Sequence, residues 1–85
     1  MPMYREECTL ADLRVGERAT VTSLSTEEGM RHRLWNMGMV EGTMVECAFH
    51  SPSGDPVAYI LRGTVVALRR HDAATVLVKR EGLCG

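Results

Sequence analysis

The sequence has few aromatic residues, which limits both its core and its choice of ligands. One Trp, two Tyr and one Phe occur among 85 residues, although 45% of the residues are hydrophobic. Val, Leu, Met and Ala must therefore fill the interior. An aromatic-lined groove for proline-rich peptides is disfavoured, and so is a row of rings on which single-stranded nucleic acid could stack.

Signals for secretion, disulfide formation or membrane insertion are missing too. Cys8, Cys47 and Cys84 lie far apart with no Cys-x-x-Cys spacing, which suits neither a disulfide framework nor a zinc ribbon. The charged N-terminus is followed by no apolar run, and no stretch approaches the roughly 20 apolar residues of a membrane span. We therefore expect a protein of the reducing cytoplasm without direct membrane insertion.

Neither sign of charge dominates. Ten Lys and Arg residues stand against eleven Asp and Glu residues, a formal net charge of −1. The whole molecule thus has no field that would attract nucleic acid or an anionic membrane. Arginines cluster only loosely, as Arg31 with Arg33 and as Arg62 with Arg69 and Arg70. No nucleic-acid partner is expected, and an acidic protein surface suits these arginines better.

No motif for catalysis is present. The sequence has no GxxxxGK phosphate loop, so the chain is not expected to hydrolyse GTP by itself. Cys47 falls on the predicted inward face of a strand, where a free cysteine acts as a small hydrophobic residue. We expect a protein that is not an enzyme.

Alternating apolar residues predict a chain made mainly of short strands. A domain of this size buries only about 60% of the surface of its unfolded chain. The expected organisation is a lead-in over 1–8, one domain over 9–80 and a flexible tail over 81–85. Helical turns are predicted near 9–13 and 70–73, and a turn at 51–56 (SPSGDP). The predicted strands are 17–24, 43–50, 57–62, 65–69 and 75–79.

One helix is predicted over residues 26–37. Met30, Leu34 and Met37 recur at i, i+4 and i+7 and form one apolar stripe, which Trp35 flanks. Ser25 and Glu28 have capping-box spacing at its start. Gly38 follows the last periodic residue, where a left-handed residue ends many helices.

Five strands around a thin aliphatic core predict a small, partly open β-barrel with this helix inserted after the first strand. Strict alternation places Val45, Cys47 and Phe49 on one inward face, and Ala19, Val21 and Ser23 on another. Several strands also carry apolar residues on the second face, part of which the helix is expected to cover. These are Met44, Ala48, Ala58, Ile60 and Val65.

Four segments in the same order resemble the ferrous iron transport protein A family, over roughly residues 9–79. Residues 10–17 (LADLRVGE) are similar to its opening "L.DL..G", and residues 33–43 (RLWNMGMVEGT) to its "RL…GL…PGT". Residues 51–56 resemble its "PLGDP" turn, and Gly63 with 67–70 (ALRR) and Ala73 its "G…LALR…EA" ending. Glu41 stands where proline is usual, Ser53 where leucine is usual and His71 where an acid is common.

The resemblance implies an SH3-like barrel that acts as a non-enzymatic accessory protein of bacterial ferrous iron uptake. The implied partner is ferrous iron transport protein B, a membrane transporter with a cytoplasmic GTP-binding domain, and the chain would reach the inner face of the membrane through it. We expect docking through the most exposed arginines, because arginine pairs well with carboxylates at interfaces. These are Arg31, Arg33, Arg69 and Arg70.

Two other readings stay open. One is a module that senses or binds Fe(II) or another divalent transition metal, with His50, His71 and Glu46 as its candidate ligands; no cofactor is otherwise required. Alternation puts Glu46 and His50 on one face of a strand but about 13 Å apart, too far to share an ion. The other is a general protein-interaction adaptor. Dimerisation also stays open.

Overall fold

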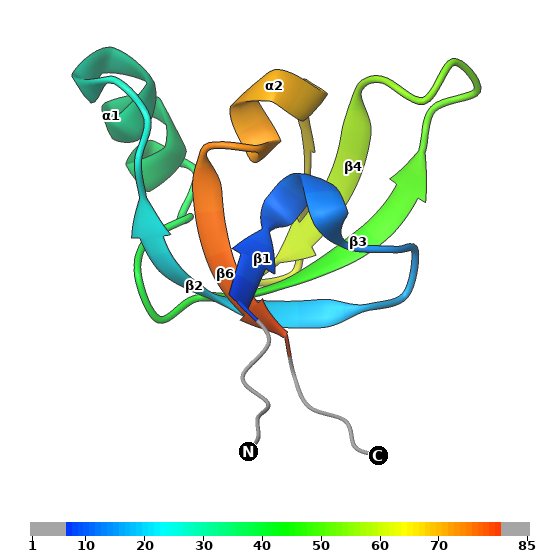
Figure 1. Ribbon diagram of the computed structural model, residues 1–85, viewed down its shortest axis with the longest axis horizontal. Helices are drawn as coiled ribbons and strands as arrows, with labels where there is room; N and C mark the ends of the chain where they lie inside the picture. Colours follow the sequence, from blue (N-terminus) through cyan, green and yellow to red (C-terminus); the bar gives the residue numbers. More distant parts are fainter. Residues whose placement is uncertain (1–6, 81–85) are drawn as a thin grey trace.

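The computed structural model describes residues 7–80. These form six strands, two short α-helices and one 3-10 turn (Figure 1). The elements in chain order are β1 (Glu7–Thr9), η1 (Leu10–Asp12), β2 (Arg18–Leu24), α1 (Glu28–Asn36), β3 (Met44–His50), β4 (Val57–Leu61), β5 (Thr64–Leu68), α2 (Arg70–Ala73) and β6 (Val76–Arg80). None of the helices in this part of the chain is long and apolar enough to cross a membrane.

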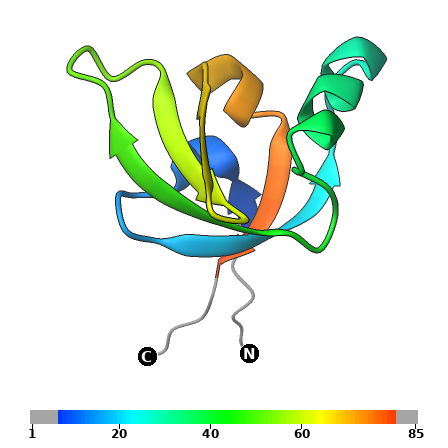
Figure 2. The same ribbon diagram turned by 180° about the vertical axis from the view of Figure 1, so that it is seen from behind.

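All six strands belong to one antiparallel sheet in the order β1-β6-β2-β3-β4-β5. The sheet is strongly curved, and α1 is inserted between β2 and β3 (Figures 1 and 2). The predicted mainly β fold with one inserted helix is confirmed. Strand β1 was not predicted, because three residues are too few to show alternation and β1 forms only against the distant β6.

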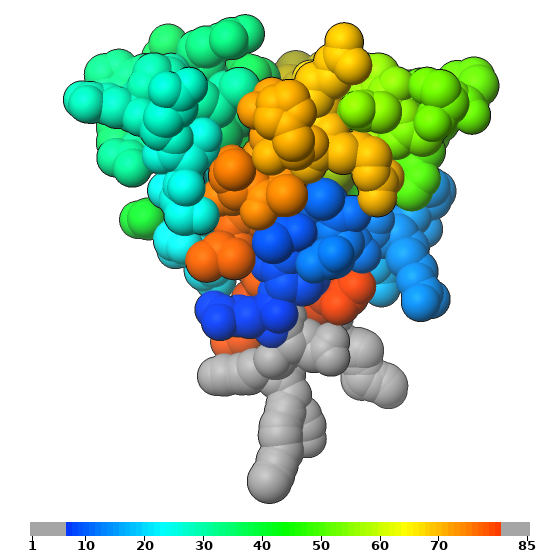
Figure 3. Space-filling view, turned by 45° about the horizontal axis from the view of Figure 1, so that its top comes forward, coloured from blue at the N-terminus to red at the C-terminus, as the bar shows by residue number. Residues whose placement is uncertain are grey.

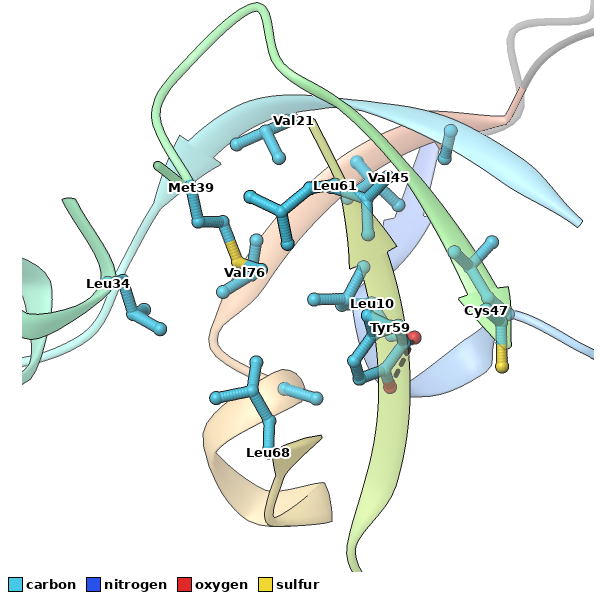
Figure 4. Close-up of a cluster of buried hydrophobic side chains, with 14 of the residues drawn as sticks. Leu10, Val21, Leu34, Met39, Val45, Cys47, Tyr59, Leu61, Leu68 and Val76 are labelled. Carbon is cyan, nitrogen blue, oxygen red and sulfur yellow. Dashed lines mark hydrogen bonds between the residues drawn. The ribbon is translucent and has the colours of Figure 1, made fainter. Parts of the chain in front are cut away.

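The concave side of the sheet holds the core (Figure 4). Tyr59 on β4 is fully buried, and its hydroxyl donates a hydrogen bond of 3.2 Å to the carbonyl oxygen of Leu10 in η1. This bond ties the first segment of the domain to β4, and burial raises the pKa of the phenol. The other fully buried large side chains include Leu34, Met39, Val45, Leu61, Val76 and Val78.

Helix α1 ends as predicted but begins differently. Gly38 has φ +97°; its N–H bonds the carbonyl of Trp35 at 2.9 Å, and the N–H of Met39 bonds that of Leu34 at 2.9 Å. These two bonds form a Schellman motif, and Met39 folds back into the core. The predicted Ser25 cap is wrong: Glu27 is the N-cap residue and has no side-chain cap. Ser25 Oγ instead donates to the carbonyl of Thr75 at 3.0 Å.

Two β-bulges overturn the predicted strand faces. The register of β3 against β4 shifts between Cys47 and Phe49, and an extra residue reverses the direction of every later side chain. Phe49 is therefore 57% exposed rather than inward. A bulge between Val21 and Ser23 in β2 acts in the same way, so that Leu24 is buried in place of Ser23.

The outer face of β3, β4 and β5 is not covered by α1 as expected. Met44 is 44% exposed and Val65 is 59% exposed. Ala58 is buried, and its cross-strand partner on β3 is Phe49. Helix α1 lies beyond one end of the sheet rather than over this face (Figure 2).

Candidate protein-interaction surface

The two predicted arginine pairs belong to segments at the same end of the molecule. Helix α1, helix α2 and the turn 51–56 all lie at one end of the molecule, away from the first residue of β1 and the last residue of β6 (Figures 1 and 2). Figure 3 shows these three segments forming adjoining parts of one surface. We call this surface, made by α1, α2 with its N-cap residue Arg69, and residues 51–56, the helical end.

On α1 the two predicted arginines differ in freedom. Arg33 is exposed. Arg31 is half-buried, and its Nη2 donates to the carbonyl of Thr26 at 3.2 Å, while its buried Nε has no hydrogen-bond partner. Arg31 thus holds the segment before α1 in place, and Arg33 is the freer of the two for an incoming carboxylate.

Beside these arginines lies an exposed aromatic pair, His32 and Trp35, that was not predicted as part of a surface site. Trp35 is 45% exposed, and its ring stacks on His32 with centroids 5.6 Å apart and an interplanar angle of 27°. The signal was available: Trp35 is one position past Leu34, about 100° around the helix from the buried stripe. Exposed Trp and Arg are the residue types that most often dominate protein interfaces.

On α2 the arginines are held by the turn 51–56. Asp55 Oδ1 accepts a hydrogen bond of 2.9 Å from the backbone N–H of Arg70. Its Oδ2 lies 3.9 Å from Nη1 of Arg69, whose side chain is 65% exposed, and Arg70 Nη1 donates to the carbonyl of Gly54 at 3.4 Å. An ion pair this long and exposed adds little stability. Asp55 therefore orients α2 and leaves most of the Arg69 guanidinium accessible.

The predicted metal ligands are not brought together. Because of the bulge in β3, Glu46 pairs with Ile60 whereas His50 pairs with Val57, so the expectation that they share a face is wrong. His71 is on α2 with its side chain 81% exposed, and its Nε2 lies 3.3 Å from Oδ1 of Asp72. Within residues 7–80, no three His, Cys, Asp or Glu side chains form a group that could hold a metal ion.

Cys47 lies inward, as predicted, and is fully buried. Burial raises the pKa of its thiol, and the nearby carboxylate of Glu17 raises it further. The thiol thus stays protonated at neutral pH, which makes it a poor nucleophile. Its role is to fill the core beside β4.

Comparison with known proteins identifies the family. Residues 8–80 match the model of the FeoA domain. Over 73 residues the chain is 37% identical to the Fe(2+) transport protein A/Fe(2+) transporter FeoB fusion protein of Porphyromonas gingivalis, a match that covers 82% of this chain and 8% of that protein. The chain thus spans a small part of this curated relative.

Solved structures agree. The FeoA protein of Chlorobium tepidum superposes with a TM-score of 0.83 at 32% identity, covering 87% of this chain and 70% of that one. The zinc complex of Stenotrophomonas maltophilia FeoA, described as a prokaryotic SH3 domain protein, gives 0.74 at 30% identity, covering 82% and 87%. The strand order, the inserted helix and these matches place the chain in the FeoA domain family.

Proposed function

We propose that this chain is a non-enzymatic accessory protein of bacterial ferrous iron uptake that acts by docking on ferrous iron transport protein B. The observation that carries the proposal is the Porphyromonas gingivalis relative, in which the matching domain and the FeoB transporter are parts of one polypeptide. Fusion keeps two domains at high effective concentration. A separate chain would have to achieve the same association through a docking surface in the cytoplasm.

The helical end is the surface that we assign to this docking. Trp35 offers an apolar anchor, and Arg33 and Arg69 offer planar, charged forks for carboxylates. Helix α2 and the turn 51–56 are already joined through Asp55, so little ordering entropy is lost on binding. Contact with the GTP-binding domain of the transporter would then alter transport or nucleotide turnover.

The test is calorimetry with the soluble GTP-binding domain of the transporter. Reversing Arg31, Arg33, Arg69 and Arg70 together should weaken binding at least about tenfold, roughly 1.4 kcal/mol. A single reversal should mainly slow association and steepen its salt dependence. As a comparison matched in net charge, Arg33→Glu/Arg69→Glu should weaken binding more than Arg14→Glu/Lys79→Glu, which lies outside the helical end. Equal effects of the two pairs would contradict docking at this surface.

Binding of Fe(II) or another divalent metal is the second candidate function. The relative from Stenotrophomonas maltophilia was solved with zinc. Within residues 7–80, His50, His71 and Glu46 belong to no group that could hold a metal ion, so these residues would need further ligands, for example from a second chain. The same titration, run with a chelator and then with Fe(II), separates the candidates. Tight metal binding with no affinity for the transporter in either condition would favour the metal module.

A further inference from the structure

Strand β5 forms an edge of the sheet and lacks the usual protection of an edge. Among the described strands its one hydrogen-bonded neighbour is β4, and the pairing of the two strands runs over five residues without a bulge. Its sequence, Thr-Val-Val-Ala-Leu, contains no proline and no charge. Soluble proteins normally block such an edge with charge, proline, a bulge or a covering segment, since it can pair with another strand.

The backbone groups at this edge point away from the sheet at two residues. Arg62 and Gly63, with φ of 52° and 77°, form a two-residue hairpin turn that pairs Leu61 with Thr64. In an antiparallel ladder, every second residue directs its N–H and C=O to the neighbour. The backbone N–H and C=O groups of Thr64 therefore point toward β4, and so do those of residues 66 and 68. The N–H and C=O groups of Val65 and Ala67 face outward, where nothing else in residues 7–80 adds a strand.

The side chains at this edge are open as well. Val65 is 59% exposed, and Thr64 and Ala67 are also exposed. Val65 lies across from Ile60 on the outer face of the sheet. An added strand would cover Val65 with one of its own side chains and would extend the apolar outer face.

Positive charge brackets the strand. Residues 62–70 contain Arg62 before β5, and Arg69 and Arg70 after it, with no acidic residue. Two acids lie nearby: Oδ2 of Asp55 is 3.9 Å from Nη1 of Arg69, and Oδ1 of Asp72 is 3.3 Å from Nε2 of His71. A strand that pairs with β5 would thus meet a guanidinium at each of its ends.

This charge pattern argues against a second copy of the chain as the occupant. Any antiparallel pairing of two β5 strands would bring the Arg62 end of one copy beside the end of the other copy that carries Arg69 and Arg70. Like charges directly opposite each other are destabilising. An extended segment with acidic residues at both ends fits both the charge and the unpaired backbone.

We propose that β5 is an acceptor edge for an extended acidic segment of a partner protein, which adds to the sheet as a seventh strand. Backbone bonds at Val65 and Ala67 supply affinity in this mode of recognition. Specificity comes from a β-branched side chain that covers Val65 and from acids that meet Arg62 and Arg69. The proposal rests on the proposed function only in taking the transporter as the expected source of the segment.

The test uses a synthetic probe, the fluorescein-labelled peptide Glu-Glu-Val-Thr-Val-Thr-Val-Glu-Glu, titrated with the full chain by fluorescence anisotropy. Ala67→Pro removes an outward N–H but no bond to β4, so we expect it to weaken binding at least about tenfold. Arg62→Gln/Arg69→Gln should weaken binding as well. Lys79→Gln, an exposed charge on β6, is the control and should leave binding unchanged.

A second arm keeps the protein native in case Ala67→Pro fails to fold. Two probes are N-methylated on alternate sets of amides. Alternate amides of an extended peptide point to opposite edges, and β5 can bond only one of these edges. Methylation of the amides that face β5 should therefore abolish binding, and methylation of the amides on the other edge should leave it intact. Equal binding of both sets, or no binding of the unmodified peptide, would overturn the proposal. Self-association of the chain that Ala67→Pro abolishes would assign the edge to a second copy instead.

The same variants distinguish a failure of the acceptor edge at β5 from a failure of docking on the transporter. If Ala67→Pro loses the peptide but still binds the transporter domain, β5 recognises a segment from elsewhere and docking at the helical end stands. If the native chain binds the peptide but not the transporter, the acceptor edge stands and the proposed function fails.

Discussion

The strongest single test of the fold is the replacement of Gly38 by valine. Gly38 ends α1 with φ +97°, and the hydrogen bonds from Gly38 and Met39 to the carbonyls of Trp35 and Leu34 depend on this conformation. Met39 then enters the core, fully buried beside α1. The turn therefore couples the end of the helix to the packing of the barrel.

The size of the effect follows from backbone strain rather than from a clash. A Cβ at Gly38 would lie 3.4 Å from Cδ of Arg62 and 3.5 Å from Cδ1 of Leu61, contacts that a flexible arginine can relieve. The left-handed backbone costs a residue with a Cβ about 1–2 kcal/mol, and a β-branched side chain resists it more strongly. We expect Gly38→Val to destabilise the protein by about 1–3 kcal/mol.

Thermal melting followed by circular dichroism measures this effect. For a domain of this size, about 1 kcal/mol lowers the melting temperature by about 4–8 °C. Gly29→Ala is the matched control, because Gly29 is inside α1 with no atom near its would-be Cβ and no positive φ. It should stabilise the helix by about 0.5–1 kcal/mol. An unchanged melt for Gly38→Val would refute the Schellman assignment.

Three further predictions concern ionisable groups. The backbone N–H of Arg14 donates a hydrogen bond of 2.8 Å to Oε1 of Glu17, and this bond is the main reason that the pKa of the Glu17 carboxyl lies below 4.5. The ionised carboxylate therefore stabilises the fold above pH 4.5, and this contribution is lost as the pH falls through the lowered pKa. Urea melts should thus show Glu17→Gln destabilised at pH 7 and nearer to wild type in acid, and a constant difference would contradict this. Cys47 should react with a thiol reagent far more slowly in the native protein than in urea, and more slowly than Cys84, which lies outside the described residues; equal native rates would contradict its burial. Tyr59→Phe should destabilise by about 0.5–1.5 kcal/mol, because the Leu10 carbonyl loses the Tyr59 hydroxyl but keeps the N–H of Leu13 at 3.2 Å; an unchanged urea midpoint would argue against the Tyr59 bond.

The candidate surface was only partly visible in the sequence. The arginines were predicted as contact residues because arginine pairs well with carboxylates at interfaces. Only the structure shows that α1 and α2 lie at the same end of the molecule (Figure 1). It also separates Arg31, which is tied to the Thr26 carbonyl, from the freer Arg33. The guanidinium of Arg31 is held by a backbone carbonyl five residues earlier in the chain. The presence of an arginine in the sequence does not show whether such a bond will form.

Features that depend on neighbouring residues could be predicted from the sequence. Alternation located most of the strands, a stripe of apolar residues located α1, and Gly38 marked its end, because each is set by local backbone sterics and side-chain spacing. Tertiary structure alone decided the features that need a distant partner. The three residues of β1 become a strand only against β6, the bulges that expose Phe49 and bury Leu24 exist only against facing strands, and β5 is an edge only because of the strand order. Hydrogen-bond pairing between distant segments sets these features, and no local pattern in the chain encodes which segment will lie alongside another.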